Sequence, residues 1–342
     1  MKYLSLSDNQ RRIQINAFQL FDAALDAERR LKSFGGSLVW KTSGKRQYLF
    51  KLADRRGNGR SMGPRTPETE KVHADFHAGK VREKERLRSL QDRLAEQIRF
   101  NRAALIGRVP NVVAHLLDKL RRAGVDAHNM LVIGTNALYA YETMAGVFFD
   151  APITATTDVD LLWDNRARLK LLTGDTLSLM RILQSIDPSF ERLTGQTFRA
   201  ANKDGFLVDL IRQLPNPPCS TLPDRLGPDH DDLVATDIWN MKWLLSAPRI
   251  VQPIIAENGQ MALMPVLDPR AFAAFKLWLA HSQERSPTKR PRDLSQAEAL
   301  LSVIHEHLPQ YPLDEQALKM FPKEVAAATL AATPAAAFLP HR

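Results

Sequence analysis

The stretch that decides the fold reads LVIGTNALYAYETMAG over residues 131–146 and is followed by TATTDVDLLW over residues 154–163. The first part has the pattern of an apolar strand, a Gly134-Thr135 turn and a helix. The second part has the pattern of a strand that carries Asp158 and Asp160 two positions apart. The order and spacing of these features raise the question of a site for metal ions and phosphates.

The two aspartates are expected to face the same way. Side chains i and i+2 of a strand point to one face, so Asp158 and Asp160 present two carboxylates to one spot. Like charges repel unless a cation lies between them. Mg²⁺ is the expected cofactor, with Mn²⁺ as an alternative, because it takes oxygen ligands and keeps positions open for substrate phosphates. Alone, such a pair is more often a strand end or a turn cap.

Two further features strengthen this interpretation. Gly134 lets a phosphate approach the backbone at a helix start, where free N–H groups and the helix dipole favour anions, and Thr135 adds a hydroxyl. By itself this turn is an ordinary helix N-terminus. Asp209 then falls within the apolar run GFLVDLIR, a costly place for an uncompensated charge. If its strand lies beside that of Asp158 and Asp160, the three carboxylates can hold two ions, and Asp209 can accept a proton from an attacking hydroxyl.

Gly134-Thr135, Asp158-x-Asp160 and Asp209 together resemble the signature of the polymerase-β-like nucleotidyltransferases. The likeness extends to bacterial nucleotidyltransferase-fold proteins of unassigned role, which have a similar basic N-terminal hairpin and a similar late block, and more loosely to abortive-infection toxin nucleotidyltransferases. It implies an α/β (α+β) core with a mixed sheet and nucleotidyl transfer from an NTP. Asp158, Asp160 and Asp209 would be both catalytic residues and metal ligands. The resemblance does not name the acceptor.

The late block VLDPRAFAAFKLWLAHSQERSPTKRPRDLSQAEAL supplies cations for a nucleotide. Lys276 falls within a predicted helix among apolar neighbours, while Lys289 and Arg292 precede the next helix. We expect these three residues to contact the triphosphate or the acceptor. Asp293 either caps that helix or orients a basic side chain, and a solvated basic loop with an N-cap is the alternative.

The charge of the chain indicates a polyanionic partner. The formal net charge is +9 with a pI near 9.7, and most of the excess lies in the first 125 residues. A β-hairpin is predicted around Ser43-Gly44, then a loop over residues 55–66 and a long charged helix over residues 67–105. Basic charge attracts phosphate backbones, so RNA, and tRNA first, is the expected acceptor. The alternatives are a small molecule or protein acceptor, a catalytically silent RNA- or partner-binding module, and, more remotely, an Asp-x-Asp glycosyltransferase.

The domain organisation is predicted as three parts. These are a basic N-terminal region over residues 1–107, the catalytic core over 108–215 and a mostly helical domain over 216–342. Neither an apolar leader nor a membrane span is evident, and Cys219 is the single cysteine, so a cytoplasmic, reducing compartment is expected. A role as a toxin or phage-defence factor with an antitoxin partner would follow from the looser resemblance.

Overall fold

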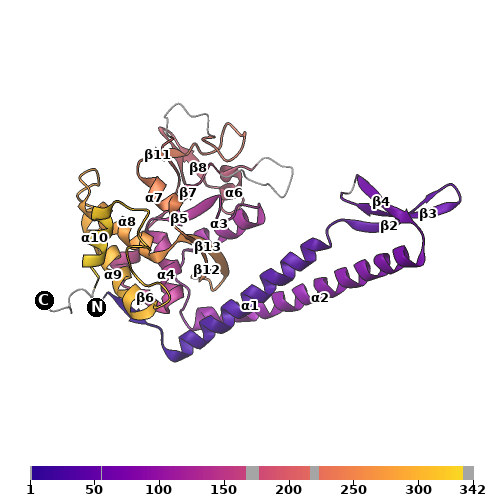
Figure 1. Cartoon of the computed structure of the whole chain (residues 1–342), viewed down its shortest axis with the longest axis horizontal. Helices are drawn as coiled ribbons and strands as arrows, with labels where there is room; N and C mark the ends of the chain where they lie inside the picture. Colours follow the sequence, from indigo (N-terminus) through magenta and orange to yellow (C-terminus); the bar gives the residue numbers. More distant parts are fainter. Residues whose placement is uncertain (1, 55, 167–176, 216–222, 334–342) are drawn as a thin grey trace. The chain divides into compact units, whose positions relative to one another are not determined.

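The computed structural model describes residues 2–54, 56–166, 177–215 and 223–333 (Figure 1). The chain forms two compact units, one of Met1–Arg11 with Leu105–Arg342 and one of Arg12–Ala104. In the described ranges, no helix is long and apolar enough to cross a membrane. The predicted domain boundaries after residues 107 and 215 stay predictions.

The smaller unit consists of two long helices and an antiparallel sheet (Figure 1). Most of α1 (Asp8–Ser33) and all of α2 (Pro67–Ala103) belong to it, and β2 (Ser37–Ser43), β3 (Arg46–Leu52) and β4 (Gly59–Pro64) form the sheet in that order. Thr66 begins α2 with a reciprocal capping box to Thr69. The prediction of a loop over residues 55–66 is wrong for residues 59–64, which form β4 and extend the sheet. Asp54 stabilises the turn before β4 by accepting hydrogen bonds from Asn58.

The larger unit is built on a six-stranded sheet, which is mixed, as predicted. Its main path is β5 (Met130–Ile133), β7 (Asp158–Trp163), β10 (Leu207–Gln213), β9 (Gln196–Ala201) and β8 (Glu191–Leu193), with β11 (Thr236–Ile238) paired to β10. Strands β7 and β10 are parallel, whereas β5 and β9 run antiparallel to their neighbours. The register therefore places four residues side by side across the adjacent strands β5, β7, β10 and β9: Ile133, Asp160, Asp209 and Arg199.

Helices and smaller strands complete this unit. The β5 strand leads into η1 (Thr135–Ala137) and α4 (Leu138–Ala145), and α8 (Pro269–His281) packs on α9 (Arg290–His307) and α10 (Lys323–Ala331). The other elements are α3 (Asn111–Arg122), β1 (Tyr3–Ser5) paired with β6 (Val147–Phe149), α5 (Ala151–Thr154), α6 (Leu179–Gln184), α7 (Met241–Ser246) and the hairpin β12 (Arg249–Ile255) and β13 (Met261–Leu267).

Several local predictions are corrected. The predicted strand of Asp158 begins at Ile153, but Ile153 and Thr154 belong to α5 (Ala151–Thr154). The sequence ATDIWNMKWLLSAP over residues 235–248 predicts a helix capped by Asp237. Asp237 instead lies in β11 and accepts a hydrogen bond from Nε of Arg212 on β10 at 2.5 Å. A tryptophan is more often a core residue than a base-stacking platform, which predicts that Trp239 lies in the core, but Trp239 is 70% exposed. Of the helix predicted over residues 166–186, α6 is present, and residues 167–176, like Cys219, lie outside the described residues.

Candidate active site

One cavity of about 500 Å³ in the larger unit brings the predicted site residues together. It lies where β5 turns into η1, beside β7, β9 and β10 and against α8 and α9. Its lining includes all the candidate site residues identified from the sequence: Gly134, Thr135, Asp158, Asp160, Asp209, Lys276, Lys289, Arg292 and Asp293. It also includes residues that the sequence reasoning missed or left aside: Thr156, Arg199, Arg285 and Gln296.

The carboxylates of β7 and β10 lie on adjacent strands. Asp160 is in direct register with Asp209, and Asp158 is two residues earlier on the same face. Asn136 donates from Nδ2 to the Asp158 carbonyl at 2.5 Å, and the Thr156 hydroxyl donates to the Asp158 carboxylate. Burial, then the charges of Asp158 and Asp209, raise the pKa of Asp160 to about 6. The site therefore holds negative charge that a cation would stabilise.

Gly134 has a reason to be glycine that the sequence did not reveal. Its φ is 67° and its ψ is −157°, a region almost restricted to glycine. A Cβ at this position would lie 2.1 Å from Oδ2 of Asp160. The glycine therefore leaves room for the Asp160 carboxylate, whereas its contact with phosphate stays a prediction.

A Gly134→Ala substitution is expected to destabilise the protein by more than the roughly 1–3 kcal/mol of backbone strain alone, because its methyl group would displace Asp160. Gly195→Ala is the matched control, since Gly195 also has a positive φ of 79° but has open space around its Cβ position. Urea unfolding of the two variants provides the measurement. Equal losses in the free energy of unfolding would contradict this interpretation of Gly134.

Asp209 is bound by an arginine on the neighbouring strand. Arg199 donates from Nε and Nη2 to the two carboxylate oxygens, at 2.7 and 2.6 Å. Arg199 and Asp209 are each five residues from Asp204, the centre of the Lys203-Asp204-Gly205 turn. A hairpin centred on this turn places them opposite each other, so the sequence contained a signal for their pairing. In the described residues, no three acidic, histidine or cysteine side chains lie close enough to hold a metal ion as they stand. The donor set of Asp158 and Asp160 fits a hard cation, and each Asp209 oxygen keeps a second lone pair with which it could join them.

A buried ion-pair cluster lies on the helical side of the cavity. Lys276, only 4% exposed, donates from Nζ to Asp293 at 2.8 Å, and Arg285 donates to the other Asp293 oxygen at 2.6 Å. Burial lowers the pKa of Lys276. Burial acts to raise the pKa of Asp293, but the neighbouring charges of Lys276 and Arg285 have the larger combined effect, so the pKa is lowered. Asp293 therefore orients basic side chains rather than capping α9, whose N-cap, Lys289, makes no side-chain cap bond.

Unpartnered polar atoms lie near this cluster. The Arg292 Nε is buried and has no hydrogen-bond partner among the described residues, although its Nη2 donates to the Ala155 carbonyl. Gln296 donates from Nε2 to the Ile153 carbonyl at 2.8 Å and to the Thr135 hydroxyl at 3.2 Å, while its Oε1 is unpaired. An unsatisfied buried donor is costly, so Arg292 fits an anionic oxygen of a bound substrate.

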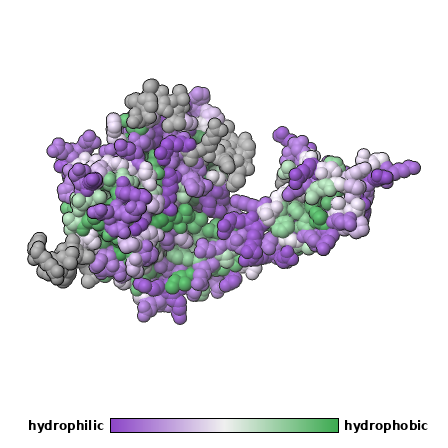
Figure 2. Space-filling model, viewed as in Figure 1, coloured by the Kyte–Doolittle hydropathy of each residue, from purple (hydrophilic) through white to green (hydrophobic). Residues whose placement is uncertain are grey.

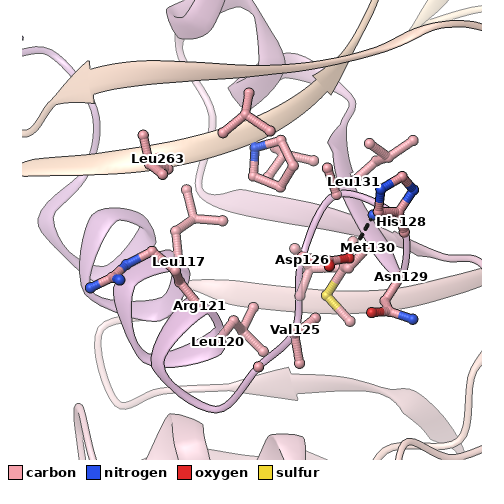
Figure 3. Close-up of a pocket in the computed structure, with 16 residues that line it drawn as sticks. Leu117, Leu120, Arg121, Val125, Asp126, His128, Asn129, Met130, Leu131 and Leu263 are labelled. Carbon is pink, nitrogen blue, oxygen red and sulfur yellow. Dashed lines mark hydrogen bonds between the residues drawn. The ribbon is translucent and has the colours of Figure 1, made fainter. Parts of the chain in front are cut away.

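A larger cavity of about 650 Å³ has a different character (Figure 3). It surrounds the start of β5 and is lined mainly by aliphatic side chains of α3, β5 and β13, including Leu117, Leu120 and Leu263. Its Asp126 carboxylate accepts from the backbone N–H of His128 at 2.8 Å and so stabilises the local turn. This cavity lacks the converging carboxylates and cations of the first, so the first is the candidate active site.

Comparison with known proteins agrees with this choice. The sequence profile of a protein family described as nucleotidyltransferase matches residues 111–322. This range includes every residue that lines the candidate site. No curated protein and no solved structure matches the chain.

Proposed function

The chain belongs to this nucleotidyltransferase family, and we propose that it transfers a nucleoside monophosphate from an NTP to a hydroxyl group of RNA, with tRNA as the first candidate. The observation that carries the proposal is the single cavity in which Asp158, Asp160 and Asp209 face a group of cations. Those cations are Arg199, Lys276, Arg285, Lys289 and Arg292.

The cations support the binding of a triphosphate. Lys276 and Arg285 are held by Asp293, which leaves Lys289 and the buried Nε of Arg292 as the proposed phosphate contacts. Thr135, fixed by Gln296, would donate its hydroxyl to a phosphate oxygen. Positioning and charge neutralisation are the main requirements of phosphoryl transfer. These residues would therefore hold the β- and γ-phosphates as pyrophosphate leaves.

The carboxylates support metal binding and the activation of the acceptor. Asp158 and Asp160, joined by Asp209, would hold two Mg²⁺ ions, which supply positive charge at the reacting phosphate. The acceptor oxygen forms a bond to the α-phosphorus as the bond from that phosphorus to the β-phosphate oxygen breaks. We assign to Asp209 the uptake of the proton from the acceptor hydroxyl, since it lies in the same row as Asp160.

Labelling tests the proposed reaction. The full chain is incubated with Mg²⁺, total RNA and each NTP in turn, labelled at either the α- or the γ-phosphate, and the RNA is resolved on a denaturing gel. We expect RNA to receive the α-label but not the γ-label, and EDTA to prevent the transfer. Absence of α-label from every RNA would contradict an RNA acceptor. Label in protein or in small molecules would identify the other acceptor class.

Replacement of Arg199 by methionine is expected to make the protein more dependent on Mg²⁺. Without this guanidinium, Asp209 faces Asp158 and Asp160 with no adjacent countercharge, and like charges destabilise one another. The melting temperature should therefore fall in EDTA and rise further with Mg²⁺ than in the unsubstituted chain. Arg192→Met, on the neighbouring β8 strand and outside the cavity, is the control. Equal Mg²⁺ shifts in both variants would argue against a metal site beside Arg199.

A further inference from the structure

We propose that the smaller unit binds single-stranded RNA on one face of its β2–β3–β4 sheet, with bases stacked on Tyr48 and Phe50 and phosphates held by Lys41 and Arg46. The proposal rests on the proposed function in one respect: it assumes that RNA is the acceptor. It adds the part of the chain that recognises this RNA and the chemistry by which it does so.

The two faces of the sheet are different. Register places Leu49 opposite Trp40 and Gly63, so these residues share one face. Leu49 is fully buried, and the Cβ position of Gly63 lies 3.9 Å from the Thr69 methyl group of α2. The Trp40 ring lies 5.6 Å from that of His73, which is also on α2. This face is therefore covered by the helix.

The opposite face carries aromatic rings and cations. Tyr48 is in register with Lys41, and Phe50 with Val39 and Ser61, so these side chains point away from α2. Tyr48 and Phe50 are partly exposed and lie two positions apart on β3, about 6.8 Å along the strand. Lys41 places its Nζ 4.9 Å from the centroid of the Phe50 ring. Rings at this spacing can each stack one base of an extended strand.

The charge around this face favours a polyanion. Residues 37–66 contain eight Lys and Arg residues and one acidic residue, Asp54. Asp54 is engaged with Asn58 and the backbone of its own turn. Lys41 and Arg46 are both exposed on the open face. Hydrophobic and hydrophilic residues lie side by side over this sheet (Figure 2).

Single-stranded RNA explains the aromatic rings and the charge together. Proteins that bind single strands combine a basic surface with aromatic side chains on which bases stack. The bases of double-stranded RNA are already stacked on one another within the duplex. A duplex would therefore contact the cations but would not stack on Tyr48 and Phe50. An anionic membrane would likewise require charge, but it would not depend on flat rings. The contribution of the two rings therefore separates these partners.

Binding is tested by fluorescence anisotropy with a labelled 12-nucleotide single-stranded RNA and no NTP. We expect the Tyr48→Leu/Phe50→Leu double variant to bind it at least about tenfold more weakly, since stacking of bases on aromatic side chains is a main contribution to single-strand binding. The leucines retain apolar side chains but remove both rings. Trp239→Leu is the matched control, because Trp239 is an exposed aromatic residue in the other unit. The Trp239→Leu variant should bind the RNA as tightly as the unsubstituted chain does.

A second variant keeps the test informative if the double variant fails to fold. Lys41→Glu reverses an exposed charge on the same face and should also weaken binding and reduce its salt dependence. Lys84→Glu, exposed on α2, is its matched control. Unchanged RNA affinity in folded variants of the open face, or equal losses in their controls, would overturn the proposal. Binding to phosphatidylserine vesicles with none to RNA would also overturn it.

The outcome is separable from that of the proposed reaction. The binding measurement contains no NTP, so RNA binding that depends on Tyr48 and Phe50 would support the surface even if no nucleotide were transferred. Transfer to RNA without such binding would leave the reaction standing and remove the surface.

Discussion

Replacing Asp160 with asparagine is expected to reduce nucleotidyl transfer by more than about 100-fold. Changes to residues that merely support a metal ligand cost about 10–100-fold in affinity or activity, and Asp160 is proposed as a ligand itself. The substitution keeps the shape of the side chain but removes its negative charge. The charges of Asp158 and Asp209 repel the Asp160 carboxylate and, after burial, contribute to its raised pKa. The neutral amide removes this repulsion and has the same shape, so the fold should persist. Transfer of α-label to RNA is the measurement.

Asp204→Asn is the matched control for Asp160→Asn. Asp204 lies in the exposed turn between β9 and β10 and pairs with Lys203, so its amide variant should retain full activity. The two variants should have similar melting temperatures. A fully active Asp160→Asn protein would remove the proposed role of the β7 carboxylates.

The second large effect is expected from Asp293→Ala, which should lower the free energy of unfolding by about 3–5 kcal/mol. The substitution leaves Lys276, 4% exposed, without the carboxylate that accepts its hydrogen bond. Urea unfolding provides the measurement. The double variant Asp293→Ala/Lys276→Met should recover much of the loss, because the cation that remains buried in the single variant is gone. Equal losses in the single and double variants would contradict this explanation.

The same variant should have a characteristic pH dependence. Burial places the pKa of Lys276 in the folded protein below its ordinary value of 10.5, and removal of Asp293 should lower it further. The folded variant then binds fewer protons at this lysine than the unfolded chain does, so its stability rises with pH. The loss caused by Asp293→Ala should therefore shrink as the pH approaches about 10.5. A loss that stays constant over this range would argue against an unpaired lysine as its cause.

Much of the site could be predicted because its chemistry is local in sequence. Asp158 and Asp160 share a strand face whatever the strand packs against, and Gly134-Thr135 follows an apolar strand. Asp209 was identifiable because a charge within an apolar run requires a partner. The mixed sheet followed from the order of the elements and from the family resemblance, and the family match over residues 111–322 confirms the nucleotidyltransferase class.

The errors arose where local patterns compete with tertiary contacts. Asp237 has the residue type of a helix cap, but pairing of β11 with β10 places it opposite Arg212. Residues 59–64 are rich in glycine and polar side chains, yet β3 supplies a partner strand for them. Trp239 was assigned to the core by its residue type alone, although it is 70% exposed. In the first two cases, pairing with a strand outweighed the local propensity. In the third, the residue type did not predict the exposure of the side chain.

The sequence by itself indicated the residues of the candidate site: three aspartates, a glycine-threonine turn and a late group of cations. The tertiary structure alone decided how they are paired. It placed Arg199 on Asp209, Asp293 between Lys276 and Arg285, and the Asp160 carboxylate where a side chain at Gly134 would lie. Strand register and burial depend on contacts between residues far apart in the chain, and side-chain periodicity within one element does not specify those contacts.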